Sequence, residues 1–302
     1  MGNTINVDNK YFPALGKLFS PMVINSLVWK NYSPYLAEVC SNSGLLDKLD
    51  LSMTLGNFFN FIYDLLFKNY RNEYIFKNVI ANKILLGKHS LNTSQLLMEF
   101  RAGKSKADVV LLNGTSTVYE IKSEYDSFSR LKKQIRSYCD VFDYINVITT
   151  NKQANKITSC LPEKVGILVL TERDTISTFR NPKSNKENIK LAILFNSLRK
   201  TEYTNIIKRY YGTIPDVPNT IIYKVCKELF CKIPVSTAHD LTINVLKRRS
   251  DVKILKDFIE KAPSSTIAYI LTIGNQEKQM KTLISILNKE LQDFIIPCNI
   301  ER

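Results

Sequence analysis

The strongest constraint on the fold of this 302-residue chain is an Asn113-Gly114 pair between two β-prone runs. The first run covers 107–112 and is mostly apolar, and the second covers 117–123 and is rich in β-branched and aromatic residues. Asn-Gly between two such runs is typical of a tight hairpin turn, because the glycine adopts positive φ without steric cost. The pattern therefore predicts a β-hairpin.

Charged residues are expected to meet at one end of this hairpin. With a three-residue loop over 113–115, Asp108 lies opposite Glu120 on the neighbouring strand. Side chains two apart on a strand share a face, so Glu120 and Lys122 project together while Ile121 faces the core. The hairpin thus predicts a cluster of two carboxylates and one lysine.

Such a cluster suits metal-dependent phosphodiester cleavage. Two close carboxylates repel each other unless a cation lies between them, and Mg²⁺ binds oxygen ligands of this kind. A bound Mg²⁺ activates water and stabilises the charge that builds on a phosphate, and a lysine can hold the water or the phosphate. The alternative is that these are ordinary solvated charges at strand ends, since acid and lysine pairs at this spacing are common in basic proteins.

The segments around the hairpin carry clear periodicities. Apolar residues recur at helical spacing before the hairpin and after it, and short β-prone runs fill the remaining places. The expected elements, in chain order, are a helix over 71–86, strands over 95–102, 107–112 and 117–123, a helix over 130–142 and a strand over 145–149.

This arrangement resembles the PD-(D/E)xK nuclease superfamily, whose core runs helix, three antiparallel strands, helix, strand. The resemblance implies an α/β (α+β) protein with a restriction-endonuclease-like core and helical additions at both ends. It implies a Mg²⁺ or Mn²⁺ site formed by Asp108, Glu120, the carbonyl of Ile121 and a first-helix glutamate, Glu73, with Lys122 as the catalytic lysine. The alternative for Glu73 is a helix N-terminal acid favoured by the macrodipole. Alanine, and not proline, precedes Asp108, which the superfamily tolerates.

Two further features extend the resemblance. Gln134 and Tyr138 have the Q-x-x-x-Y spacing of the RecB-like branch, and this implies contact with a nucleic-acid strand; a core tyrosine and a surface glutamine are the alternative. Glu99 is a candidate extra metal ligand, or a partner of Arg101 or Lys122. The phrase Tyr-Glu-Ile-Lys-Ser-Glu-Tyr-Asp, followed by Arg-Leu-x-x-Gln, is similar to a bacterial and prophage-borne family of predicted nucleases over 55–180. A phage-defence or mobile-element setting is therefore expected.

The net charge of +14 favours polyanionic partners, because binding to phosphates releases counterions. The side chains expected to contact nucleic acid beside Gln134 and Tyr138 are Arg101, Lys104 and Lys106, with a solvated basic loop as the alternative for the two lysines. DNA is the expected substrate and RNA stays open, as does a protein partner or a homo-oligomer.

Three regions are expected along the chain. Residues 1–70 form helices that pack on the core, 71–180 form the nuclease core, and 186–302 form a helical C-terminal domain after a turn-rich boundary at 180–185. Two more strands are expected over 165–170 and 175–179.

Several other functions lack support in the sequence. The six cysteines (Cys40, Cys139, Cys160, Cys226, Cys231, Cys298) form no C-x-x-C pair, so free thiols are expected rather than a zinc site. Neither His89 nor His239 lies in a recognisable nucleophile motif, and no phosphate-binding glycine loop is present. No run is long enough to span a membrane, and the start has no secretory signal, so a cytoplasmic protein is expected.

The sequence thus predicts a Mg²⁺-dependent nuclease, with DNA as its substrate. Two rival hypotheses stay open at this point. One is a module that keeps the fold and binds nucleic acid without cutting it, and the other is an effector whose cleavage depends on a partner.

Overall fold

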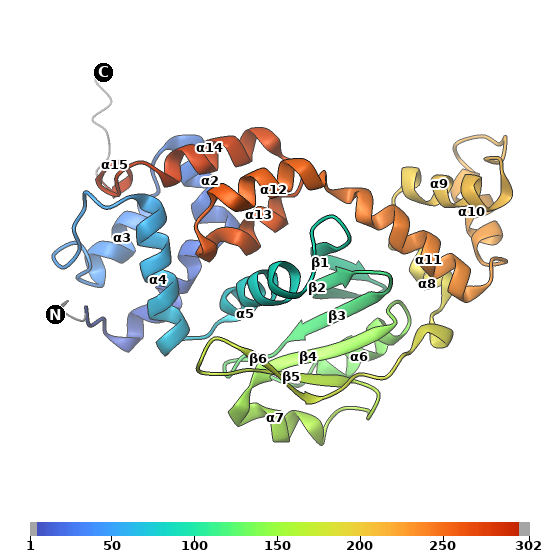
Figure 1. Ribbon diagram of the computed structural model, residues 1–302, viewed down its shortest axis with the longest axis horizontal. Coiled ribbons are helices and arrows are strands. Elements are labelled where there is room, and N and C mark those ends of the chain that lie inside the picture. Colours follow the sequence, from blue (N-terminus) through green and yellow to red (C-terminus); the bar gives the residue numbers. More distant parts are fainter. Residues whose placement is uncertain (1–4, 296–302) are drawn as a thin grey trace. The chain divides into compact units, whose positions relative to one another are not determined.

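The computed structural model describes residues 5–295, which pack as two units (Figure 1). The sheet unit comprises 83–251, and the helical unit combines the chain before residue 83 with the chain from residue 252 onward. The boundaries predicted at 70 and at 180–186 do not coincide with this division. The predicted C-terminal domain is divided, because its first helices share a core with the sheet and its last helices pack with the N-terminal ones.

The sheet unit contains a mixed six-stranded sheet whose strands follow chain order (Figure 1). The first three strands and the last pair are antiparallel, whereas β3, β4 and β5 run parallel. The strands are β1 (Gln95–Ala102), β2 (Ser105–Leu112), β3 (Ser116–Ile121), β4 (Tyr144–Thr150), β5 (Gly166–Leu170) and β6 (Ile176–Arg180). All six predicted strands are confirmed to within a few residues, and the chain is a mixed α/β protein.

The predicted hairpin is formed by β2 and β3. Leu112 pairs with Ser116, so the loop has three residues, and Gly114 has φ +68°. The N–H of Asn113 donates to the carbonyl of Thr115 at 3.0 Å and closes the loop. Local turn chemistry therefore sets the register of the whole hairpin.

Parallel pairing requires crossover connections, and two helices supply them. α6 (Leu131–Cys139) connects β3 to β4, and α7 (Asn151–Thr158) connects β4 to β5. α6 lies within the predicted helix over 130–142. β4 and β5 are almost entirely buried, as expected for strands covered on both faces.

Four more helices complete the sheet unit: α8 (Leu191–Phe195), α9 (Lys200–Tyr211), α10 (Ile222–Phe230) and α11 (Val235–Leu246). Their apolar faces join one hydrophobic core with β1 to β5 and α6. A buried ion pair adds to this packing, since the guanidinium of Arg249 binds both carboxylate oxygens of Glu202 at 2.7 and 2.8 Å.

The helical unit begins with capped helices. Ser20, Ser33 and Thr54 each accept a hydrogen bond from a backbone N–H in the first turn of the next helix, and prolines open two of these helices. The helices before the sheet are α1 (Phe12–Gly16), α2 (Pro21–Lys30), α3 (Pro34–Asn42), α4 (Leu55–Asn69) and α5 (Glu73–Val79), which continues as a π-helical segment over Ile80–Leu86. The predicted helix over 71–86 is thus present, as an α-helix in its first part and a π-helix in its last part.

The last helices return to the first ones. They are α12 (Val252–Lys261), α13 (Ile267–Ile273), α14 (Glu277–Leu287) and α15 (Gln292–Ile295). The side chain of Asn78 donates to the carbonyl of Ser264 at 2.8 Å and accepts from the N–H of Ala268 at 3.0 Å. Asn25 accepts hydrogen bonds from Tyr269 and Gln279 in the same way. These contacts join segments nearly 200 residues or more apart.

The state of the cysteines and the lengths of the helices can be compared with the expectations of free thiols and of no membrane-spanning run. Among residues 5–295 the five cysteines are free thiols, and Cys298 lies outside the described residues. No described helix has the length and apolar character needed to cross a bilayer.

Candidate active site at the end of the central hairpin

The register of the hairpin brings two of the predicted acids to neighbouring positions. Val109 pairs with Tyr119, so the next residues along the two strands, Asp108 and Glu120, face each other. Oδ2 of Asp108 accepts a hydrogen bond of 2.8 Å from the backbone N–H of Ile121. The carboxylate of Asp108 is thereby fixed at the end of β3. The N–H of Ile121 holds Asp108, whereas a metal-ligand role for its carbonyl stays a prediction.

Glu120 and Lys122 form a buried ion pair. Nζ of Lys122 lies 2.8 Å from Oε1 of Glu120, and the two residues are only 8% and 1% exposed, respectively. Charges removed from water in this way are stable only when they are paired and hydrogen-bonded. The predicted pairing of Glu120 and Lys122 on one face is therefore present, and it is shielded from solvent.

Tyr138 supplies the second contact of the Glu120 carboxylate. Its hydroxyl oxygen lies 2.6 Å from Oε2 of Glu120 and 3.0 Å from the carbonyl oxygen of Lys106. Burial, followed by the nearby negative charge of Glu120, raises the pKa of the Tyr138 phenol well above its usual value. Tyr138 is therefore a neutral hydrogen-bond donor that holds the carboxylate in place.

This position corrects the predicted role of Tyr138 in binding nucleic acid. The residue is 0% exposed and its side chain projects from α6 into the core, so its ring is not available to a nucleic-acid strand at the surface. Gln134, one turn earlier, is half-buried, and its Oε1 is enclosed without a hydrogen-bond partner in the described part of the chain. The Q-x-x-x-Y spacing does bring both residues to one face of the helix, and that face is directed inward.

Glu99 lies beside Asp108 on the other neighbouring strand, β1. In the β1–β2 register Met98 pairs with Val109 and Phe100 with Ala107, so Glu99 stands opposite Asp108. Carboxylate oxygens of the two residues lie within 4.8 Å of each other. Glu99 has φ +55°, which a non-glycine residue adopts only at a cost. Acids from three adjacent strands thus follow one another across the sheet.

The remaining predicted ligand, Glu73, belongs to the helical unit. It is the first residue of α5 and pairs with Lys77 one turn later at 2.6 Å. This is the N-terminal acid that the macrodipole favours. A contribution of Glu73 to the metal site stays a prediction.

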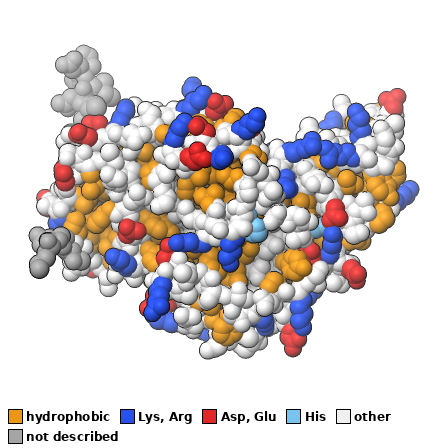
Figure 2. All heavy atoms as spheres, viewed as in Figure 1, with side chains coloured by type: hydrophobic (Ala, Val, Ile, Leu, Met, Phe, Trp, Pro, Cys, Tyr) orange, Lys and Arg blue, Asp and Glu red, His pale blue; other side chains and the backbone are white. Residues whose placement is uncertain are grey.

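The predicted basic contacts lie on the β1–β2 hairpin. Arg101 and Lys106 pair across the two strands, and both are exposed, as is Lys104 in the turn. Nζ of Lys106 lies 2.5 Å from Oε2 of Glu99, so this lysine binds an acid of the candidate site. On the face shown in Figure 2, lysine and arginine side chains are dispersed among acidic and apolar ones.

One anchor of the backbone at the end of β3 could not be predicted from the sequence. The hydroxyl of Thr149 on β4 donates to the carbonyl of Lys122 at 2.7 Å, and the N–H of Lys122 donates to the carbonyl of Ile148 at 2.9 Å. These bonds fix the backbone of the lysine just beyond the strand. Thr149 follows four apolar or amide residues in β4, and nothing in that pattern distinguishes it from an ordinary strand threonine.

A buried histidine network lies at the other end of the hairpin. Nε2 of His239 on α11 lies 2.8 Å from Oγ of Ser116, and Nδ1 lies 3.4 Å from Asp240. Burial lowers the pKa of the imidazole, so it is neutral near pH 7. Ser116 and His239 are both buried, which leaves a substrate no access to the serine. We therefore assign this group a structural role that connects α11 to β3.

Comparison with known proteins identifies a family. The model of the family described as bacteriophage P4 protein cII matches residues 67–269, which is more than half of the chain. The chain therefore belongs to this family. Protein cII of Enterobacteria phage P4 is 20% identical over 147 residues, which cover 48% of this chain and 54% of that protein. The chain thus spans about half the length of this curated relative.

One solved structure is similar over a limited region. It is a protein of unknown function from Silicibacter pomeroyi, 16% identical, and the match covers 40% of this chain and 82% of that chain with a TM-score of 0.28. A TM-score at this level does not establish a shared fold.

Proposed function

We propose that this chain is a Mg²⁺-dependent nuclease that hydrolyses phosphodiester bonds, with DNA as its substrate, in a phage or mobile-element setting. The observation that carries the proposal is the set of acids on three adjacent strands, Glu99, Asp108 and Glu120, with Lys122 bound to the last. The order α5, β1, β2, β3, α6, β4 agrees with the restriction-endonuclease-like core of the PD-(D/E)xK superfamily. The phage origin of the curated relative supports the proposed setting.

The donor set fits a hard divalent cation. Glu99 and Asp108 offer carboxylate oxygens within 4.8 Å of each other, and such a pair repels unless a cation is shared. Glu120 is a further proposed donor, since each of its oxygens retains a lone pair beyond its contact with Lys122 or Tyr138. When bound there, Mg²⁺ would supply a polarised water and would neutralise charge on the phosphate. The Ile121 carbonyl and Glu73 are further proposed ligands.

Lys122 and Tyr138 have supporting roles in the proposed reaction. The ammonium of Lys122 is held by Glu120 and by the fixed backbone at Ile148 and Thr149, so its location is set before a substrate arrives. In the proposed reaction it orients the attacking water or stabilises the negative charge on the phosphate. Tyr138 restrains Glu120 and so contributes to catalysis only through that carboxylate.

A second candidate function is a nucleic-acid-binding module that does not cut. The observation that favours it is the burial of Glu120 and Lys122, since a pair this enclosed also serves as a purely structural ion pair. The two hypotheses differ in one consequence. The nuclease requires the metal and Asp108 for turnover, whereas the binding module binds nucleic acid equally well without either.

The test combines substrates, metals and one conservative variant. We expect the purified protein to cleave DNA with Mg²⁺ or Mn²⁺, to be inactive in EDTA, and to lose activity in Asp108→Asn. The asparagine keeps an oxygen that can accept from the N–H of Ile121, so the fold is preserved. Parallel reactions with RNA identify the substrate. Binding without cleavage of either nucleic acid would select the non-cutting module.

A further inference from the structure

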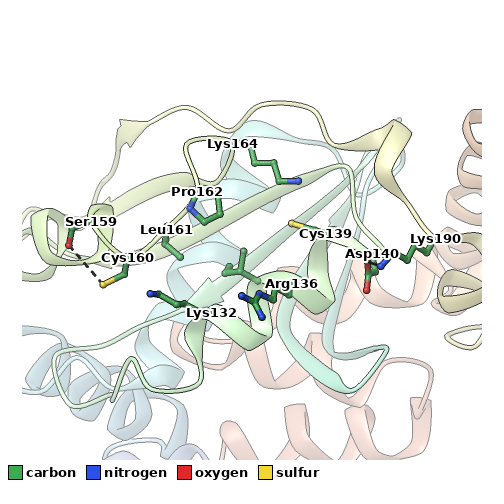
Figure 3. Close-up of a pocket in the computed structure, with 11 residues that line it drawn as sticks. Lys132, Arg136, Cys139, Asp140, Ser159, Cys160, Leu161, Pro162, Lys164 and Lys190 are labelled. Atoms are coloured by element: carbon green, nitrogen blue, oxygen red, sulfur yellow. Dashed lines mark hydrogen bonds and ion pairs between the residues drawn. The ribbon is translucent and has the colours of Figure 1, made fainter.

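A basic pocket lies beside α6 and contains no residue of the candidate active site (Figure 3). Its volume is about 770 Å³, and its walls are α6, the connection from α7 to β5, and Lys190. Residues four apart share one face of a helix, so Lys132 and Arg136 project to this side, whereas Gln134 and Tyr138 project inward. One helix thus separates two distinct sites of the sheet unit.

The charges of the pocket are unbalanced. Two of its lysines are already bound, Lys190 to Asp140 at 2.8 Å and Lys164 to the side chain of Asn185 at 2.7 Å. Lys132 and Arg136 are exposed and have no hydrogen-bonding or ion-pair partner within residues 5–295. Asp140 is the only acid that lines the described pocket. Two uncompensated cations, one helical turn apart, are therefore directed at the same space.

An apolar surface accompanies these charges. Ile135 lines the pocket beside the basic residues, as do Leu161 and Pro162. Leu161 and Pro162 are labelled in Figure 3. Pockets of 300–1,000 Å³ with apolar walls and a few convergent polar groups are typical of small-molecule sites. Arginine and lysine recognise phosphate oxygens by charge-assisted hydrogen bonds, and the planar guanidinium does so with two parallel bonds.

We propose that this pocket binds a phosphate-bearing ligand of nucleotide size. Its phosphate lies between Lys132 and Arg136, and its less polar part lies against Ile135, Leu161 and Pro162. The ligand is either a free mononucleotide or one nucleotide of a nucleic-acid strand, since both present the same chemical groups. This proposal does not depend on the nuclease activity, because the pocket contains no residue of the candidate active site.

The first test measures binding by titration calorimetry in EDTA, so that no cleavage takes place. The probes are dAMP and a six-nucleotide single-stranded DNA. We expect the double substitution Lys132→Ala and Arg136→Ala to weaken binding by at least about tenfold, because two charge-assisted contacts are lost. Lys133→Ala is the matched control, since Lys133 is an exposed lysine on the same helix and does not line the pocket.

Each outcome of this titration decides the proposal. If the wild type binds dAMP and the double substitution weakens that binding, the ligand is a free nucleotide. If only the oligonucleotide binds, and the double substitution weakens its binding, the ligand is a nucleic-acid strand. The proposal is overturned if the double variant and the wild type bind the probes with equal affinity. It is also overturned if the wild type binds neither probe at millimolar concentration.

A second measurement uses the thiols of the pocket. Cys139 and Cys160 are half-buried in its wall, whereas Cys231 is exposed elsewhere. We expect the bound probe to slow alkylation of Cys160 by N-ethylmaleimide and to leave Cys231 unaffected, as followed by peptide mass spectrometry. An unchanged rate at Cys160 with saturating probe would contradict the proposal.

Discussion

The phenol oxygen of Tyr138 lies 2.6 Å from Oε2 of Glu120, while Nζ of Lys122 lies 2.8 Å from Oε1 of the same carboxylate. Glu120 is therefore held at both oxygens by groups from two elements, α6 and the end of β3. A carboxylate held in this way has little freedom to rotate, and its orientation is set by the fold. The pairing of Tyr138 with Glu120 thus connects packing in the core to the chemistry proposed for the site.

Removal of the Tyr138 hydroxyl should affect both stability and activity. We expect Tyr138→Phe to lower the free energy of unfolding by about 1–2 kcal/mol, because a buried carboxylate loses one hydrogen-bond donor. Cleavage should slow because Glu120 is less restrained. Tyr144→Phe is the control, since Tyr144 is half-buried and makes no hydrogen bond with its hydroxyl in the described structure. Urea unfolding and cleavage rates measure the two effects, and wild-type activity in Tyr138→Phe would contradict the role given to this hydroxyl.

The buried tyrosines should limit stability at alkaline pH. Burial raises the pKa of Tyr119 to about 12, and burial together with Glu120 raises the pKa of Tyr138. A folded-state pKa above the unfolded value means that stability is fully present below about pH 10 and decreases as pH rises toward the folded pKa. Absorbance at 295 nm should therefore show these phenols ionising only together with the loss of helical circular dichroism. Complete titration of all tyrosines near pH 10 in the folded protein would contradict this.

Asp143 should stabilise the sheet unit at neutral pH and lose that effect in acid. Burial alone would raise the pKa of Asp143, but hydrogen bonds from Ser184, Thr115 and the N–H of Asn185 outweigh it and lower the pKa. Its stabilisation is present above the unfolded pKa of about 4 and is lost as pH falls through the lower folded value. We expect Asp143→Asn to cost about 1–3 kcal/mol at pH 7, because buried donors lose their charged acceptor.

The difference in free energy of unfolding between Asp143→Asn and the wild type should diminish as pH falls below about 4, because protonation removes the same charge from the wild type. Urea unfolding at pH 7, 5 and 3 measures it. Asp216→Asn, at an exposed position, serves as the control. A difference that is independent of pH would show that the charge of Asp143 contributes nothing.

Metal binding should stabilise the protein in proportion to its occupancy. A ligand that binds only the folded state raises the melting temperature, by linkage. We expect Mn²⁺ to raise the melting temperature of the wild type and to have a much smaller effect on Asp108→Asn and Glu99→Gln. Glu172→Gln, an exposed acid, should respond as the wild type does. An equal response of all four proteins would place the cation elsewhere.

The elements and the hairpin register were predictable because short-range patterns determine them. Asn113 and Gly114 fix the loop, the loop fixes the register, and the register alone places Asp108 opposite Glu120. The inward orientation of Tyr138 was not predictable, since helical spacing indicates which residues share a face and not whether that face is buried.

The division into units was not predictable for a related reason. The last helices pack with the first through buried amides such as Asn25 and Asn78, whose partners lie nearly 200 residues or more away. An isolated asparagine in a helix carries no sign of such a partner. The position of Glu99 was not predictable either, because it lies beside Asp108 only through the pairing of a second hairpin, β1 with β2.

The most direct test of the central claim is the single-turnover rate of DNA cleavage in Mg²⁺ for the wild type, Lys122→Met and Lys152→Met. Lys152 is an exposed lysine, with 80% of its side chain accessible, and it lies outside the candidate site. Circular dichroism first confirms that each variant is folded. We predict cleavage by the wild type and by Lys152→Met, and a rate lower by at least about a hundredfold for Lys122→Met, because a positioned charge is lost from the reaction centre. Cleavage by Lys122→Met at the wild-type rate, or no cleavage of DNA by the wild type, would contradict the proposed function.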